Sequence, residues 1–284
     1  MSAASKPRTA LVLCGGGSRG AAEVGFYRAL REAGVQVDMI VGTSVGAVNG
    51  AFIASGLEPD AIKNLWLNFH KWRPFRFNWR ALWQWHNAAA LFDPSGFRNF
   101  LKDTLAVSRF EDLEIPLTVV ATNLQKAESV CLEEGDLMFA IMASIALPLY
   151  FPPLPFGRHQ LVDGGVTNNV PLDVAVRKGA TRVYAMLCGC QDEMDRPVSG
   201  FLNIQSRAFN IATRQKLYWD LEHLKDKAEI IVLEPCLSSA KYVLDFSRTE
   251  LIIEEAYQFT KSALSRRANQ GAAPAGSPSQ ELKT

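Results

Sequence analysis

The sequence predicts an α/β fold with three layers, in which helices cover both faces of a mainly parallel central sheet. Two observations predict it. Short β-branched and aliphatic runs alternate with segments of helical periodicity along most of the chain. The 284 residues are also 48% hydrophobic, which is enough for a sizeable buried core. We therefore expect one large domain over residues 1–267 and a disordered tail at 268–284, where Ala, Gly, Pro and Ser predominate.

The elements of the first third follow one another closely. An aliphatic strand at 9–14 ends at a glycine cluster, and apolar residues at helical spacing predict a helix over 21–33. A second strand is expected at 35–41. A helix of small residues follows at 45–54 and stops at Gly56. These four elements form the start of a βαβα succession.

The remaining elements are spaced more widely. Residues 116–123 read as a buried strand, and a short strand at 160–162 precedes Asp163. Two more strands, at 182–187 and 229–233, are separated by a long helix over 201–224. A final helix is expected at 249–265. The uncharged run 137–156 is too rich in proline in its second half to cross a membrane, so we expect a buried helix over 137–147 and then an extended loop.

Residues 61–92 interrupt this alternation with an aromatic-rich segment. They hold five of the six tryptophans together with lysines and arginines, and they contain no Asp or Glu. Such a composition suits the boundary between lipid headgroups and acyl chains, and therefore peripheral membrane contact. It equally suits a lid whose aromatic rings pack on the core. The two interpretations are compatible, and both stay open here.

Charge and cysteine usage exclude several classes of protein. A net charge of +1 argues against a nucleic-acid-binding protein. The five cysteines are scattered, and Cys188-Gly189-Cys190 has neither a second cysteine pair nor clustered histidines, so no metal site is expected. We expect reduced thiols in a cytoplasmic protein, because no secretory signal is visible at the N-terminus.

Gly42-Thr43-Ser44-Val45-Gly46 is the most informative stretch of the chain. This G-x-S-x-G sequence lies between an apolar strand and a small-residue helix, the setting of a nucleophile elbow. The two glycines leave room for neighbouring backbone in so sharp a turn. Ser44 could also be a plain helix N-cap, but the flanking glycines favour a nucleophile.

The glycine cluster Gly15-Gly16-Gly17-Ser18-Arg19-Gly20 follows a strand and opens a helix. Its backbone N–H groups can therefore hold a phosphate or the oxyanion of a tetrahedral intermediate. The same residues fit the dinucleotide fingerprint G-x-G-x-x-G, with Asp38 near the position of a ribose-binding acid. A pyrophosphate and a nucleophilic serine would compete for the same strand ends, so we favour the oxyanion interpretation.

A nucleophilic serine needs a base. The histidines are His70, His86, His159 and His223, and only His223 follows Ser44 and a plausible acid in the chain order of an α/β-hydrolase triad. His223, however, sits in a charged helical stretch. Asp163, which ends a strand and precedes Gly164 and Gly165, is the better base, because removal of water would raise its basicity.

The three clusters, in this order, resemble the patatin-like phospholipase family. The likeness continues in Ala143-Ser-Ile-Ala-Leu-Pro148 and in Asp163-Gly-Gly-Val-Thr-Asn-Asn169, and it covers roughly residues 9–190. It implies that Ser44 is the nucleophile and Asp163 the general base. It also implies that the N–H groups of Gly15, Gly16 and Gly17 form the oxyanion hole, while Arg19 steadies the loop or a substrate phosphate.

The resemblance further implies a serine acyl hydrolase acting on phospholipids or related acyl lipids, without cofactor or metal. Two alternatives stay open at this point. One is a Ser–His esterase that uses His223, and the other is a non-catalytic lipid-binding or regulatory module whose dyad is idle.

Overall fold

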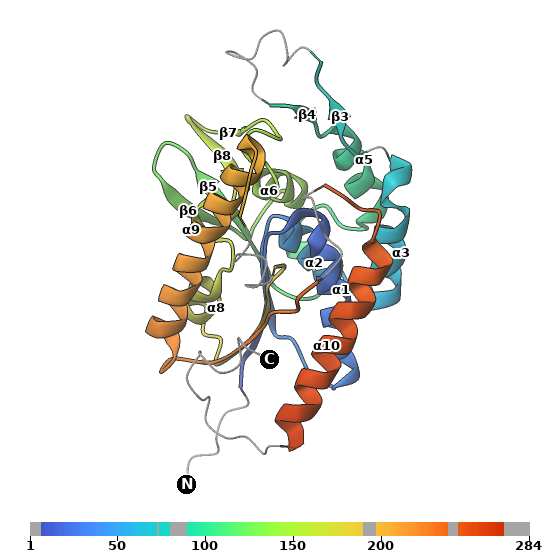
Figure 1. Ribbon diagram of the computed structural model, residues 1–284, viewed down its shortest axis with the longest axis vertical. Coiled ribbons are helices and arrows are strands. Elements are labelled where there is room, and N and C mark those ends of the chain that lie inside the picture. The colour runs from blue at the N-terminus through green and yellow to red at the C-terminus, as the bar shows by residue number, and fades with distance from the viewer. Residues whose placement is uncertain (1–6, 73, 80–89, 190–196, 238–243, 270–284) are drawn as a thin grey trace.

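The computed structural model describes residues 7–72, 74–79, 90–189, 197–237 and 244–269. Its centre is an eight-stranded sheet in the order β10-β9-β1-β2-β5-β8-β7, with β6 paired to β5 (Figure 1). The strands from β10 to β5 are parallel, and β6, β7 and β8 are antiparallel to their neighbours. The strands are β1 (Thr9–Leu13), β2 (Met39–Thr43), β5 (Leu117–Asn123), β6 (Glu128–Leu132), β7 (Leu154–Phe156), β8 (His159–Asp163), β9 (Arg182–Met186) and β10 (Glu229–Leu233).

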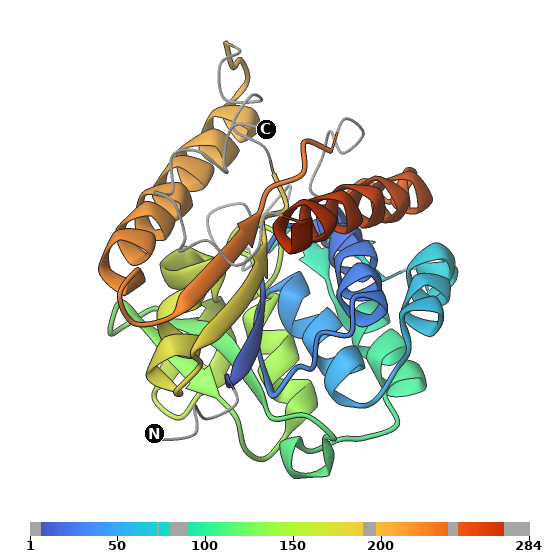
Figure 2. The same cartoon turned by 90° about the horizontal axis from the view of Figure 1, so that it is seen from below.

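Helices cover both faces of the sheet, which confirms the predicted three layers (Figure 2). The main helices are α1 (Ala22–Glu32), α2 (Val45–Ala54), α3 (Pro59–Asn68), α5 (Ser95–Thr104), α6 (Leu137–Ser144), α8 (Leu172–Arg177), α9 (Phe201–Leu224) and α10 (Thr249–Asn269). The shorter ones are α7 (Gly165–Asn168) and the 3₁₀ turns η1 (Gly17–Ala21), η2 (Phe69–Trp72) and η3 (Phe110–Asp112).

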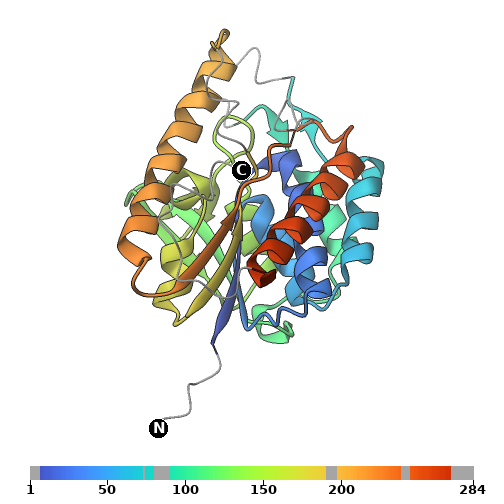
Figure 3. The same cartoon turned by 60° about the horizontal axis from the view of Figure 1, so that its bottom comes forward.

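Strand β1 shows how the two faces are built. Successive side chains of a strand point to opposite faces. Leu11 and Leu13 join the larger apolar cluster, to which α1, α2 and α10 contribute. Ala10 and Val12 join a second cluster that includes residues of α8 and α9. Burial on both faces explains why the strand sequence is apolar throughout. Figure 3 shows the sheet running between α9 and α10.

The C-terminal helix α10 packs against α1, so the first and last α-helices of the described chain lie in one layer. A Cβ atom on Gly25 would lie 2.1 Å from the carbonyl oxygen of Ile253, so only glycine permits this close approach. The Tyr257 hydroxyl also donates a hydrogen bond to Glu32 at 2.6 Å. The expectation of a single domain agrees with this packing and stays a prediction. Helix α10 continues to Asn269, past the predicted end at residue 265, so the first two residues of the expected tail are helical. The rest of the expected tail, residues 270–284, lies outside the described residues.

Most predicted elements were found, and the differences have physical reasons. Strand β2 begins at Met39 and not at residue 35, because Gly34 (φ 73°) ends α1 and the following residues form a connection. Helix α6 ends at Ser144, before Pro148. Strands β6 and β7 and helices α3, α5, α7 and α8 were not predicted.

The aromatic-rich segment 61–92 divides into a packed part and an exposed part. Trp66 and Phe69 are buried, and Phe69 lies edge-on to Phe100 with ring centroids 4.9 Å apart. The hairpin of β3 (Arg76–Phe77) and β4 (Phe92–Asp93) projects at the top of Figure 1. There Trp79 is 71% exposed. Residues 80–89, with Trp83 and Trp85, lie outside the described residues.

The uncharged run 137–156 forms the expected buried helix, which is shorter than predicted, and then a turn at 148–150 in place of a fully extended loop before β7. Within the described parts of the chain, no helix is long and apolar enough to cross a membrane.

Candidate active site

Ser44 occupies a strained turn between β2 and α2. Its φ of 54° and ψ of −124° lie in a region that non-glycine residues rarely adopt, so surrounding contacts must hold it there. A Cβ atom on Gly42 would lie 2.4 Å from the carbonyl oxygen of Gly46, and one on Gly46 would lie 2.3 Å from that of Leu13. Both flanking glycines are therefore required by backbone contacts, and the sequence forms a sharp strand-to-helix elbow with Ser44 at its tip.

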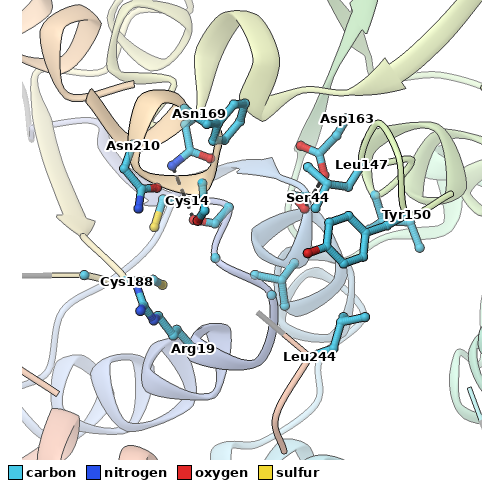
Figure 4. Close-up of a pocket in the computed structure, with 18 of the residues that line it drawn as sticks. Cys14, Arg19, Ser44, Leu147, Tyr150, Asp163, Asn169, Cys188, Asn210 and Leu244 are labelled. Atoms are coloured by element: carbon cyan, nitrogen blue, oxygen red, sulfur yellow. Dashed lines mark hydrogen bonds between the residues drawn. The ribbon is translucent and has the colours of Figure 1, made fainter. Parts of the chain in front are cut away.

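Sheet register brings Asp163 to this elbow from 119 positions further along the chain. Thr43 pairs with Val120 of β5, and the next residue of β5, Ala121, pairs with Asp163 at the end of β8. The Ser44 hydroxyl donates to Oδ2 of Asp163 at 2.6 Å, as Figure 4 shows. The two side chains singled out in the sequence therefore meet as a hydrogen-bonded pair.

The second carboxylate oxygen of Asp163 is also held. It accepts the backbone N–H of Gly165 at 2.7 Å, which fixes the carboxylate with Oδ2 toward the serine. Asp163 is 3% exposed. Burial raises the pKa of Asp163 to about 6, and the hydrogen bonds from Ser44 and Gly165 limit that rise. The carboxylate is thus a stronger base than an ordinary aspartate and is still ionised at neutral pH.

This raised pKa predicts the pH dependence of hydrolysis. The base must be deprotonated to accept the serine proton, so kcat/KM should rise with pH and level off above a midpoint near the pKa of about 6. A pH–rate profile between pH 4 and 8 with a soluble ester checks it. A midpoint near the ordinary aspartate value, about 4, would contradict an environment that strengthens the base.

The glycine loop lies against the elbow, at the carboxyl ends of the strands. The N–H of Gly15 donates to the carbonyl oxygen of Asn169 at 3.3 Å, and Asn169 Nδ2 donates back to the Gly15 carbonyl at 3.3 Å. Asn169 therefore anchors the start of the loop, a role that the sequence interpretation missed. Because the Gly15 N–H has an acceptor, Gly16 and Gly17 are the better of the three expected oxyanion donors. Arg19 lines the same cavity.

Ser144 is a second residue that the sequence interpretation did not single out. Its hydroxyl accepts the backbone N–H of Ser44 at 2.7 Å and donates to the carbonyl oxygen of Val120 at 2.6 Å. The Ser144 carbonyl accepts the N–H of Gly164 at 3.3 Å. Ser144 is fully buried and links the elbow, β5 and the turn that carries the base. The sequence signal that could have identified Ser144 was its position in the motif 143–148.

Removing the Ser144 hydroxyl should disturb this arrangement. Ser144→Ala leaves the Ser44 N–H buried without its acceptor, so we expect a loss of about 1–3 kcal/mol in the free energy of unfolding, together with a lower kcat. Urea unfolding and ester hydrolysis measure both. Ser55→Ala is the matched control, because that hydroxyl bonds only to the nearby Phe52 carbonyl. Equal kcat in the two variants would contradict a role for Ser144 at the elbow.

Ser44 and Asp163 open into a cavity of about 1080 Å³ that also reaches the glycine loop. One part of the cavity is aromatic and includes Trp66, Phe69 and Phe100. Another part is polar and is formed largely by α9. A volume of this size with a long apolar wall suits an extended apolar substrate.

Two alternatives from the sequence do not agree with the structure. Asp38 accepts the backbone N–H of Thr9 at 2.7 Å, at the opposite end of the sheet from the glycine loop, so the dinucleotide interpretation is wrong. His223 stacks on Trp219 and contacts its carbonyl at 2.7 Å, on an exposed part of α9. No described histidine lines the cavity, and His86 lies outside the described residues.

The cysteines require a correction. Cys14, Cys131 and Cys188 are free, but Cys236 is disulfide-bonded, so the expectation of five reduced thiols is wrong at that residue. The structure also brings Cys14 and Cys188 together with Glu23. That cluster could not be predicted from spacing, because its members are far apart in the chain.

The fold and the elbow define an α/β protein with a serine at a sharp strand-to-helix turn, hydrogen-bonded to a buried carboxylate. Residues 11–176 match the sequence model of the family described as patatin-like phospholipase. The chain belongs to this family.

Relatives and a solved structure extend the comparison. The chain is 32% identical over 273 residues to patatin-like phospholipase domain-containing protein 7 of Rattus norvegicus, covering 88% of this chain and 20% of that protein. It is 34% identical over 189 residues to neuropathy target esterase sws of Drosophila melanogaster, covering 65% of this chain and 13% of that protein. The chain thus spans about a fifth or less of these relatives. The crystal structure of VipD from Legionella pneumophila shares the fold, with a TM-score of 0.51 at 14% identity, covering 93% of this chain and 67% of that one.

Proposed function

We propose that the chain is a serine acyl hydrolase that cleaves ester bonds of phospholipids or related acyl lipids. The observation that carries the proposal is the 2.6 Å hydrogen bond between Ser44 and a buried Asp163 inside a cavity with a long apolar wall. Membership of the patatin-like phospholipase family supports it. In this proposal Ser44 and Asp163 form a catalytic dyad, and no histidine takes part.

The chemistry follows from the geometry. Asp163 accepts the proton of the Ser44 hydroxyl as its oxygen attacks the ester carbonyl. The N–H groups of Gly16 and Gly17 stabilise the oxyanion, and Asp163 then returns the proton to the leaving alcohol. A water molecule attacks the acyl–Ser44 ester and gives its proton to Asp163. Fatty acid leaves, and the serine hydroxyl is restored.

Charge in the cavity favours an anionic headgroup. Asn203, Arg207, Asn210 and Arg214 recur at helical spacing along α9, and all line the cavity, where Figure 4 shows Asn210. Arg19 lines it from the glycine loop. Arg214 pairs with Glu234, which does not line the cavity. Among the described lining residues, Asp163 alone carries a carboxylate. A phosphate beside the ester would therefore meet guanidinium and amide donors.

Release of fatty acid from defined lipids tests the proposal. The wild-type chain should release fatty acid from phospholipid vesicles, and faster than from an uncharged glyceride with the same acyl chain. Ser44→Ala should release none. Fatty acid release that is equal for the two lipids would contradict the anionic headgroup, and no release from either would contradict the function.

We further propose that the β3–β4 hairpin meets the lipid surface, so that a cytoplasmic protein would associate peripherally with membranes. Phe77 and Trp79 lie edge to face with ring centroids 4.8 Å apart, and both are exposed. The backbone N–H of Leu91 donates to the carbonyl of Leu149 at 2.9 Å. Leu149 is exposed and also lines the cavity. The hairpin therefore places exposed apolar rings next to the entrance residue of the substrate cavity.

Vesicle flotation tests this contact. Trp79→Ala should weaken binding to anionic phospholipid vesicles about five- to tenfold, because one exposed indole loses its place at the lipid boundary. Trp219→Ala on α9 is the matched control, since that tryptophan is 60% exposed and lies on another element. Equal binding of the two variants would contradict contact between the hairpin and the lipid surface. The segment would then be a lid that packs on the core.

A further inference from the structure

Cys14, Glu23 and Cys188 meet beneath the glycine loop. Cys14 directly precedes the loop at the end of β1, Glu23 lies in the first turn of α1, and Cys188 follows β9. The two sulfurs and a carboxylate oxygen of Glu23 lie within 4.8 Å of one another, and Cys188 Sγ is 4.0 Å from Glu23 Oε1. All three residues are buried, and Glu23 is 0% exposed.

We propose that these three side chains bind a divalent, thiophilic cation of the zinc type. Cysteine thiolates and glutamate carboxylates are both ligands that zinc takes in proteins. With metal–sulfur and metal–oxygen bonds of about 2.3 and 2.1 Å, the donor atoms of one tetrahedron lie roughly 3.5–3.8 Å apart. The observed separations therefore need to shorten by less than about 1.5 Å. Binding releases the two thiol protons, and the carboxyl proton that buried Glu23 holds in the absence of a cation, to solvent, so atoms and charge balance without any redox step.

The surroundings of Glu23 support a metal ligand. Its Oε2 accepts an N–H of Asn49 at 2.8 Å, while Asn49 Oδ1 accepts the indole N–H of Trp66 at 2.8 Å. This chain of bonds fixes the carboxylate and leaves Oε1 directed toward the sulfur of Cys188. Metal-binding carboxylates are commonly oriented in this way by groups behind them. A carboxylate so deeply buried needs either a proton or a cation.

The charge balance also suits a divalent ion. Two thiolates, one carboxylate and a divalent cation sum to one negative charge. The guanidinium of Arg19 lies beside Cys188 and interacts with it electrostatically (Figure 4). Arg19 can therefore offset that charge.

A bound ion would link the glycine loop to the end of β9. Cys14 and Cys188 line the substrate cavity and Glu23 does not, so a bound ion would lie at the wall of the cavity, between the two sulfurs and the carboxylate. A Cβ atom on Gly16 would lie 2.6 Å from Cys188 Cβ, so the loop packs directly on a ligand. A bound ion would hold the loop against β9 whether or not Ser44 is a nucleophile.

Cobalt titration under nitrogen tests the site on the full chain. The wild-type protein should bind one equivalent of Co²⁺ with a thiolate-to-cobalt charge-transfer band, and zinc should remove the band by competition. Cys14→Ser should lose the band. Cys131→Ser is the matched control and should keep it, because Cys131 is free but belongs to β6. Glu23→Gln should weaken binding at least tenfold, and it leaves both thiols in place if Cys14→Ser fails to fold.

Three results would overturn the proposal. The first is the absence of the band in a folded wild-type protein. The second is a band that persists in Cys14→Ser. The third is a peptide map of the isolated protein showing Cys14 and Cys188 joined by a disulfide bond, which would assign the pair to thiol oxidation. None of these readouts depends on hydrolysis, so failure of the proposed enzyme function would be distinguishable.

Discussion

Ser44→Ala should lower kcat for a short-chain nitrophenyl ester by about a thousandfold or more, because no other group can form the acyl-enzyme. The change removes only the hydroxyl. The elbow should survive, because the backbone bond from Ser44 to Ser144 and the close contacts of Gly42 and Gly46 do not involve the side chain. Circular dichroism and thermal unfolding provide the control for folding. A variant that keeps the wild-type rate would contradict the assignment of the nucleophile.

Asp163→Asn should reduce kcat by a similar factor of about a thousand, because an amide cannot accept the serine proton. His223→Ala should leave kcat unchanged, since His223 stacks on Trp219 on the outer part of α9. Steady-state kinetics of the two variants separate the dyad from a Ser–His triad. The reverse pattern, with activity lost in His223→Ala alone, would establish the triad.

Thermal stability shows whether Asp163→Asn loses activity because the base is gone or because the protein no longer folds. Burial raises the folded-state pKa of Asp163 to about 6, so the protonated form is favoured and stability falls as pH rises through that value. The ionised carboxylate then costs on the order of 3 kcal/mol at pH 8. The uncharged variant avoids this cost. Its Tm should equal or exceed that of the wild type at pH 8, and the difference should shrink toward pH 4.

The local parts of the site were predictable from the sequence. The elbow at Ser44 depends on contacts within a few residues and on the strand before it. Gly42 and Gly46 indicate those contacts in the sequence, because a side chain at either position would collide with backbone. Asp163 was recognisable because it ends a short strand and is followed by two glycines. The distance between the two residues could not be predicted, because it depends on the antiparallel pairing of β8 with β5.

The contacts missed in the sequence are long-range and depend on individual atoms. Ser144 acts through its hydroxyl on a residue 100 positions away, and Asn169 binds Gly15 across 154 positions. Glu23 and Cys188 are separated by 165 positions. Strand β7 was missed because it is only three residues long and contains Pro155, which is tolerated at the edge of the sheet.

The aromatic segment shows the limit of composition as evidence. Tryptophan, arginine and the absence of acids fitted both a lid and a membrane surface. In the structure Trp66 donates its indole N–H to buried Asn49, whereas Trp79 faces solvent, and contact of the exposed part with a membrane stays a prediction. Composition cannot distinguish two such neighbours.

Labelling with a fluorophosphonate probe, followed by peptide mapping, tests the central claim most directly. The probe forms a covalent bond only with an activated serine, so it should label Ser44 in the wild-type chain and should label little or none of Asp163→Asn. Labelling that requires Asp163 and maps to Ser44 is the predicted result. A wild-type chain that stays unlabelled, or a label on another serine, would contradict the Ser44–Asp163 dyad.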